Sequence, residues 1–184
     1  LSMSPLMRRK HLILKRTFDL LISSFVIIFI LSWLIPIVGL FIKIDSPGPI
    51  FFPQPRAGKN GVYFFCFKFR SMKIDASKND SRVTRVGEFL RKTSLDEFPQ
   101  FLNVFLGHMS IVGPRPHPKS LNDKYDLQVQ RYNERLLVKP GITGLSQVAG
   151  YRGETKDQQT MQNRIRIDLL YIKSWSPMLD LRIF

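Results

Sequence analysis

The chain has 184 residues, with 28 Lys and Arg against 14 Asp and Glu, and a formal net charge of +14. A chain of this length forms one compact domain by default, and its charge fits nucleic acid, an anionic membrane surface or a phosphorylated substrate as a partner. The single cysteine, Cys66, excludes an internal disulfide, and three scattered histidines offer no zinc cluster with it.

The first predicted element is an apolar helix, because Leu20 to Ile42 contains no charged residue. As a helix it would be about 35 Å long, which is enough to cross a bilayer, and no small-residue cleavage site follows to suggest a signal peptide. Basic residues lie on both sides, and the positive-inside rule would keep both flanks in the cytoplasm. Two interpretations remain, a spanning helix or a re-entrant helix broken near Pro36, where the Ser32 hydroxyl could bond a freed backbone group.

The next elements are a turn and a strand. Ser46-Pro47-Gly48-Pro49 predicts the turn, and Val62 to Met72 predicts a strand rich in phenylalanine. Alternation puts two sets of side chains on opposite faces, namely Tyr63, Phe65, Phe67 and Phe69 on one and Cys66, Lys68 and Arg70 on the other. Two cations on one face suit a phosphate site, and a solvated face explains them equally well. Lys73 to Arg85 is polar and predicts a loop.

An acidic pair follows at the start of a predicted helix. Ser94 and Glu97 have the spacing of a capping box, and Pro99 is tolerated only near a first turn, so Asp96 or Glu97 lies in that turn. The positive end of the helix dipole would keep Asp96 ionised and would favour a bound phosphate, an arrangement that suits covalent phosphoryl transfer. An ordinary acidic first turn explains the same pair. Arg115, between two prolines, could likewise be a surface arginine.

The last third predicts two further helices and a loop. Leu121 to Val138 has the pattern of an amphipathic helix, and Thr160 to Ser174 of another. Pro140 to Gly153 holds four glycines and predicts a loop against a ligand or a membrane, without the glycine pattern of a dinucleotide site. The apolar terminus from Trp175 to Phe184 suits a membrane interface. Since the chain lacks an initiator methionine and ends inside an apolar run, we expect a piece of a longer protein.

Six motifs, in this order, resemble the catalytic domain of the bacterial sugar transferases, or monotopic phosphoglycosyl transferases. They are Lys15-Arg16-Thr17-Phe18-Asp19, Ser46-Pro47-Gly48-Pro49, Lys68-Phe69-Arg70-Ser71-Met72, Leu95-Asp96-Glu97, Gly113-Pro114-Arg115-Pro116 and Lys139-Pro140-Gly141-Ile142-Thr143-Gly144. The resemblance runs from about Lys15 to the end of the chain. It implies an α+β, mainly helical fold on the cytoplasmic face of the bacterial inner membrane. Residues 1–45 would form a basic segment and a re-entrant membrane helix, and residues 46–184 a cytosolic catalytic domain with short strands and amphipathic interfacial helices.

One feature departs from the family pattern. The family usually breaks this membrane helix at an adjacent Ser-Pro pair. Here Ser32-Trp33 stands at that position and Pro36 follows three residues later. We therefore expect the break to be displaced or shallower.

The resemblance implies transfer of a sugar-1-phosphate from a UDP-sugar to undecaprenyl phosphate, with release of UMP, as the first membrane step of exopolysaccharide or capsule synthesis. Asp96 would be the nucleophile that forms an aspartyl-phosphosugar, and Glu97 would assist as a proton acceptor or through a metal. Magnesium would be the cofactor, with Asp96 as its protein ligand. The predicted substrate-binding residues are Lys68, Arg70, Arg91, Pro114, Arg115, Pro116 and Arg152.

The sugar and the rival functions complete the predictions. Tyr151-Arg152-Gly153-Glu154-Thr155 resembles the variant in hexose-1-phosphate transferases that start exopolysaccharide synthesis with glucose or galactose. Of the two, we favour UDP-glucose as the donor. Membrane lipid and a second copy of the chain are further expected partners, and nucleic acid is not. A nucleic-acid-binding protein would not need the apolar segment. A catalytically inactive, membrane-anchored scaffold of a polysaccharide assembly complex would explain that segment but not the acidic pair or the Pro-Arg-Pro run.

Overall fold

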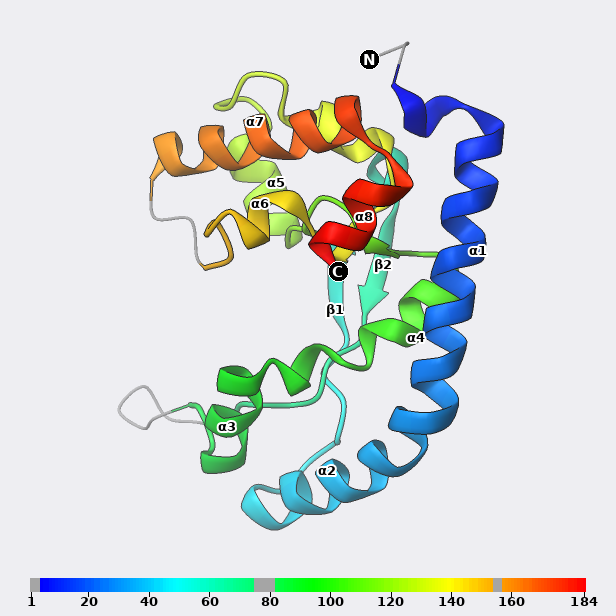
Figure 1. Ribbon diagram of the computed structural model, residues 1–184. Helices are drawn as coiled ribbons and strands as arrows, with labels where there is room; N and C mark the ends of the chain where they lie inside the picture. Colours follow the sequence, from blue (N-terminus) through cyan, green and yellow to red (C-terminus); the bar gives the residue numbers. More distant parts are fainter. Residues whose placement is uncertain (1–3, 75–81, 154–156) are drawn as a thin grey trace.

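The computed structural model describes residues 4–74, 82–153 and 157–184, and it is mainly helical (Figure 1). Residues 75–81 of the predicted loop and Glu154-Thr155 of the sugar motif lie outside the described residues. One side of the molecule is a long bent helix made of α1 (Arg9–Val26), the π-helical segment η2 (Ile27–Leu31) and α2 (Ser32–Asp45). By length and composition this helix, and no other in the described part of the chain, could cross a membrane.

The bend lies at η2, and two side chains support it. The Ser32 hydroxyl donates to the Ile28 carbonyl at 2.7 Å, and the Trp33 indole N–H donates to the Phe29 carbonyl at 2.7 Å. Wide turns free backbone groups, and these bonds satisfy two of the carbonyls there. The expected role of Ser32 is confirmed. The break, however, directly precedes the Ser32-Trp33 pair, and Pro36 lies inside α2.

Both ends of the apolar stretch are attached to the rest of the protein. The buried Asp19 carboxylate accepts hydrogen bonds at 2.9 Å from the Ser110 hydroxyl and from the Ile111 N–H of β3 (Ser110–Val112). At the other end, the Asp45 carboxylate accepts a bond at 2.9 Å from the Val86 N–H of α3 (Arg85–Thr93). Both ends of the apolar stretch are therefore held by the same folded unit.

Along one face of the long helix, large apolar side chains are exposed among the residues that the structure describes. They are Leu12, Ile13, Leu14, Leu21, Phe25, Ile28, Phe29, Trp33, Ile37, Leu40, Phe41 and Ile44. The opposite face contributes residues such as Leu31, Leu34, Val38 and Ile42 to the hydrophobic core. An exposed apolar stripe of this length marks an interaction surface.

Two small sheets lie beside the helices. Strand β1 (Gln54–Ala57) pairs antiparallel with β2 (Tyr63–Cys66), and β3 pairs parallel with β4 (Gly141–Thr143). The predicted strand was too long, because β2 ends at Cys66. Beyond that point the Asn103 amide takes the place of a neighbouring strand: it donates to the Phe65 carbonyl and accepts from the Phe67 N–H, both at 2.8 Å.

The predicted amphipathic helix is divided in two. It forms α5 (Lys119–Tyr125) and the 3₁₀ helix η5 (Tyr132–Leu137). Arg131, directly before η5, adopts a left-handed φ of 64°, which no continuous helix allows. The predicted glycine-rich loop contains β4 and the short α6 (Leu145–Val148). The next prediction is confirmed by α7 (Gln158–Ser174), and α8 (Pro177–Ile183) completes the chain.

Candidate active site

The acidic pair lies in a 3₁₀ turn between two helices. This turn, η4 (Leu95–Glu97), follows α3 and precedes α4 (Gln100–Phe105), which begins only after Pro99. Ser94 adopts a left-handed φ of 60° and ends α3, and its side chain caps no helix. The predicted capping box is therefore wrong, because Ser94 precedes η4 but its side chain makes no capping hydrogen bond there. The acidic residues stand before α4, so the helix-dipole argument for Asp96 does not apply as predicted.

Glu97 is the anion around which the cations of the turn gather. Its Oε1 accepts hydrogen bonds from Lys68 Nζ at 2.9 Å and from one Arg115 nitrogen at 2.7 Å, and its Oε2 accepts from another Arg115 nitrogen at 3.3 Å. Burial works to raise the pKa of Glu97, but the charge and hydrogen bonds of Arg115, followed by those of Lys68, lower it to about 2. Glu97 is thus ionised at neutral pH, with both oxygens occupied.

Asp96 is half-buried beside this ion-pair network. Burial raises the pKa of its carboxyl, against the attraction of Lys68, Arg91 and Arg115. Within the parts of the chain that the structure describes, no group donates a hydrogen bond to the Asp96 carboxylate. Its backbone carbonyl accepts from the Phe69 N–H at 2.9 Å, which holds the segment that carries Lys68 against the turn. The site therefore presents one unbonded carboxylate facing several cations.

Two further predicted residues reach the same turn from different elements. Arg91, on α3, donates through Nε to the Ser71 hydroxyl at 2.9 Å and is close enough to Asp96 to favour its ionised form. Arg152 follows α6 and donates to the Ser94 hydroxyl at 2.5 Å. The structure thus brings an arginine of the predicted glycine-rich loop next to the acidic pair.

Arg70 lies elsewhere, and the predicted substrate contact there needs correction. It is only 3% exposed, and its guanidinium donates to the carbonyls of Pro49, Pro47 and Ser46 at 2.6–2.8 Å. These bonds brace the turn at Gly48, whose φ is 123°. Alternation along an extended strand predicted that Arg70 and Lys68 share a face, but the strand ends at Cys66 and the pattern fails beyond it.

Two glycine-containing motifs pack backbone to backbone and fix the position of Arg115. Gly141 donates its N–H to the Pro114 carbonyl at 2.9 Å. A Cβ on Gly141 would lie 2.1 Å from the Gly113 nitrogen, and one on Gly144 would lie 2.2 Å from the Gly113 oxygen. Only glycine allows this approach. The requirement is steric, and it explains both motifs without any ligand.

A cluster of basic residues behind Arg115 was missed from the sequence. Its members are the buried His117, Arg135 and Arg164 and the partly buried Arg56. Arg56 donates to the Pro116 carbonyl at 2.8 Å, and Arg135 donates to the Arg115 carbonyl. Burial, with the charges of Arg135 and Arg164, lowers the pKa of His117 well below its usual value, so the ring is neutral. The sequence did contain one indication that Arg135 is buried. Arg135 continues the helical spacing of Tyr125, Val129 and Tyr132, which lie on the buried face.

The acidic residues allow only a simple metal site. Among the described residues, no group of three or more His, Cys, Asp and Glu side chains could hold a metal ion. Magnesium is often held by one or two carboxylates, waters and substrate phosphates. The unbonded carboxylate of Asp96 fits that arrangement, whereas both oxygens of Glu97 already bind cations.

Comparison with known proteins agrees with these features. Residues 10–184 match the family described as bacterial sugar transferase. The chain is 49% identical over 181 residues to the UDP-glucose:undecaprenyl-phosphate glucose-1-phosphate transferase of Klebsiella pneumoniae, covering 94% of this chain and 39% of that protein. It is 44% identical over 184 residues to the exopolysaccharide production protein PSS of Rhizobium leguminosarum bv. phaseoli, covering 94% and 92%. It is 39% identical over 179 residues to the UDP-N-acetylgalactosamine-undecaprenyl-phosphate N-acetylgalactosaminephosphotransferase of Aeromonas hydrophila, covering 92% and 41%.

Proposed function

Since the chain belongs to the bacterial sugar transferase family, we propose that it transfers glucose-1-phosphate from UDP-glucose to undecaprenyl phosphate, with release of UMP, as the first membrane step of exopolysaccharide or capsule synthesis. The names of its relatives support this donor, acceptor and pathway. The observation that carries the proposal is the half-buried Asp96 carboxylate, which accepts no hydrogen bond from the described residues and faces Lys68, Arg91 and Arg115. A nucleophile next to cations that can neutralise a diphosphate is what phosphoryl transfer requires.

The reaction proceeds in two displacements. In the first, an Asp96 carboxylate oxygen bonds to the phosphorus that carries the sugar, and the bond from that phosphorus to the bridging oxygen breaks. UMP leaves with the bonding electrons, and the sugar phosphate stays on Asp96. In the second, an oxygen of undecaprenyl phosphate bonds to the same phosphorus, and the Asp96 carboxylate is released. Two steps allow one site to take two bulky substrates in turn.

The cations retain donors for the substrate. A lysine ammonium has three N–H donors and an arginine guanidinium five. Lys68 uses one of its donors on Glu97 and Arg115 uses two, while both side chains keep some exposure to solvent. The remaining donors can bind diphosphate oxygens in positions that are set before the substrate arrives, and Arg115 also contacts the nucleotide, with Pro114 and Pro116 stiffening its backbone. Such preorganised charge is a large part of enzymatic rate enhancement.

Glu97 is a positioning residue in this mechanism. A carboxylate with a pKa of about 2 is a poor proton acceptor at neutral pH. Its oxygens are also both bound by Arg115 and Lys68, which leaves little capacity for a metal. Glu97 instead holds those two cations in fixed orientations. Magnesium, where it binds, would be held by Asp96 together with phosphates of the substrate, and it would supply further positive charge to the diphosphate.

The long helix serves as a re-entrant membrane anchor. Asp19 binds β3 and Asp45 binds α3, so both ends of the uncharged stretch belong to one folded domain. A spanning helix would put those ends on opposite sides of roughly 30 Å of hydrocarbon. We therefore assign residues 1–45 to the inner membrane and its cytoplasmic surface and residues 46–184 to the cytosolic domain. The exposed apolar stripe gives the undecaprenyl chain a hydrophobic approach.

The activity is tested by UMP release in detergent with magnesium, undecaprenyl phosphate and a panel of UDP-sugars. We expect release with UDP-glucose, loss of release in Asp96→Asn, and no change in Asp123→Asn, a matched control at an exposed carboxylate. Release of UMP from UDP-N-acetylgalactosamine and from no other donor would show that the assignment of UDP-glucose is wrong. Membrane association without release from any donor would instead support the scaffold interpretation.

The membrane arrangement is tested by single cysteines at Arg8 and Lys43, on either side of the apolar stretch. The native Cys66 is buried, so its background labelling should be low. A re-entrant helix predicts that a membrane-impermeant thiol reagent labels both new cysteines in inverted vesicles and neither in right-side-out spheroplasts. Labelling of the two sites from opposite sides would establish a spanning helix.

A further inference from the structure

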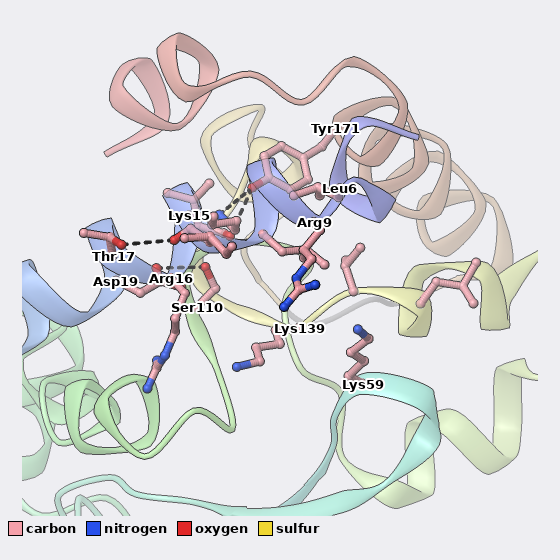
Figure 2. A pocket seen from close by; sticks show the side chains of 15 residues that line it. Leu6, Arg9, Lys15, Arg16, Thr17, Asp19, Lys59, Ser110, Lys139 and Tyr171 are labelled. Carbon is pink, nitrogen blue, oxygen red and sulfur yellow. Dashed lines mark hydrogen bonds between the residues drawn. The ribbon is translucent and has the colours of Figure 1, made fainter. Parts of the chain in front are cut away.

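A cavity of about 400 Å³ lies against the first turns of α1, apart from the acidic pair (Figure 2). Five cations line it: Arg9, Lys15, Arg16, Lys59 and Lys139. Figure 2 shows Arg9, Lys59 and Lys139 around the same space, although they come from α1, from the 3₁₀ turn η3 (Lys59–Gly61) and from the segment before β4. None of the residues assigned above to catalysis lines this cavity.

Most of these cations lack an anionic partner. Lys15 pairs with Asp180 at 2.6 Å, but no ion pair joins Arg9, Arg16, Lys59 or Lys139 to any carboxylate that the structure describes. Arg16 donates to two neutral carbonyls at the end of α4, at 2.6 and 2.7 Å. The pKa of Lys139 is lowered by burial and then by the charge of Arg16, with a smaller contribution from Lys59. The positive charges therefore repel one another.

One carboxylate does line the cavity, and it does not neutralise this group. Asp19 is buried, and its Oδ1 already accepts hydrogen bonds from the Ser110 hydroxyl and the Ile111 N–H. The charge of Asp19 acts to raise the pKa of Lys139, but burial and Arg16 lower that pKa by more. The net charge of the lining is strongly positive.

The remaining walls are apolar and continue into the exposed surface of the helix. They include Leu6, Leu12, Ile13, Leu137 and Val138. Leu12 and Ile13 are also exposed at 40% and 59%, and Ile13 precedes the uncharged stretch by about 10 Å of helix. Cations just outside an apolar membrane segment lie at the depth of lipid headgroups. The cavity thus combines a phosphate-binding end with an apolar path toward the bilayer.

We propose that this cavity binds the phosphate of an anionic membrane phospholipid, with an acyl chain against Leu12 and Ile13. The phosphate accepts charge-assisted hydrogen bonds from Lys59, Lys139 and Arg9 and offsets part of their repulsion, and the lipid fixes the first turns of α1 against β3. This site is separate from the two substrates of the proposed reaction. Its occupancy does not depend on whether the chain transfers a sugar.

Native mass spectrometry of the detergent-purified chain, without any UDP-sugar, tests the proposal. Dioctanoyl phosphatidylglycerol is the probe, and we expect one tightly retained lipid per chain. Lys59→Gln/Lys139→Gln should weaken binding by about tenfold, since it removes two charge-assisted contacts. Arg8→Gln/Lys10→Gln removes the same charge from exposed positions outside the cavity and should leave the affinity within about twofold. Where the double variant fails to fold, Lys59→Gln alone tests the same contact, because Lys59 is exposed.

Two other probes identify the source of the phosphate. Glycerol phosphate has the anion without acyl chains, and dioctanoyl phosphatidylcholine has the chains with a neutral headgroup, so we expect both to bind at least tenfold more weakly, or by more than about 1.4 kcal/mol. Equal affinity for glycerol phosphate would overturn the lipid in favour of a soluble phosphate compound. Equal affinity for the neutral lipid, or equal losses in the two double variants, would overturn the anion site altogether.

Discussion

The catalytic turn and the cavity against α1 are both rich in lysine and arginine, but they differ in what those cations face. In the catalytic turn, Lys68 and Arg115 bind Glu97. In the cavity, Lys59 and Lys139 make no ion pair with a carboxylate of the described ranges. The same residue types are therefore fixed in one region and repel one another in the other. We infer that the first region is organised before its substrate arrives, and that the second gains stability only when an anion binds.

The pKa shifts in the two regions have opposite consequences for folding. The pKa of Glu97 is depressed, so its ionised form stabilises the folded state at neutral pH. The pKa of Lys139 is lowered by burial and by Arg16, so its charged form costs the folded state free energy at neutral pH. A ligand that binds only the folded state relieves such a cost. The following experiments test this contrast, from the largest expected effect to the smallest.

Asp96→Asn should have the largest effect, because it removes the proposed nucleophile. We expect UMP release to fall by about a thousandfold or more. Burial raises the pKa of Asp96, so its charge costs stability above its ordinary pKa, and the neutral Asn should leave the melting temperature equal or higher. Activity and thermal melts of the two chains measure both effects. Retained activity would show that Asp96 is not the nucleophile.

Glu97→Gln should make the catalytic turn resemble the cavity, because it leaves Lys68 and Arg115 without their anion. We expect kcat to fall by about 10- to 100-fold through loss of positioning. The folded-state pKa is about 2 and the ordinary value 4.5, so the contribution of Glu97 is complete above pH 4.5 and lost as the pH falls toward 2. The contribution of Glu97 is on the order of 3 kcal/mol. Thermal melts across that pH range should therefore show the two chains converging. A constant difference would contradict the assigned role.

Arg70 and Arg91 offer a matched pair for separating structural from catalytic cations. Arg70→Gln breaks three bonds to buried carbonyls and should cost about 2 kcal/mol of stability, with activity per folded molecule within about threefold. Arg91→Gln should change stability by less than about 0.5 kcal/mol and lower activity about tenfold, because Arg91 acts on Asp96. A loss of activity without a loss of stability in Arg70→Gln would show that Arg70 belongs to the substrate site.

Added salt should give the smallest effect. The difference between chains in their response to salt should depend on the cavity cations. Between about 0.1 M and about 1 M NaCl the screening length falls from roughly 10 Å to roughly 3 Å, which weakens repulsion among Arg16, Lys59 and Lys139. We expect the melting temperature of the lipid-free wild type to rise by about 1–3 °C more than that of Lys59→Gln/Lys139→Gln. The Arg8→Gln/Lys10→Gln chain should respond like the wild type. Identical shifts of the melting temperature in all three chains would show that repulsion among the cavity cations does not destabilise the protein.

The sequence alone determined the features that depend on neighbouring residues. Absence of charge from Leu20 to Ile42 predicted the long apolar helix, and helical spacing predicted α7 over most of its length. The ordered motifs identified the family that the comparison then showed. Such patterns are readable because hydrophobic period and local backbone preference act over a few residues.

Only the tertiary structure decided which charge meets which. Lys68 and Glu97 are 29 residues apart and Arg152 and Ser94 are 58 apart, and no local rule predicts those contacts. The errors have the same origin: β2 stops where the Asn103 side chain replaces a strand, and Arg70 turns inward to bind the carbonyls of a distant turn. Long-range contacts satisfy buried polar groups with whatever partner the fold brings close, so their identity follows from the fold and cannot be read from sequence spacing.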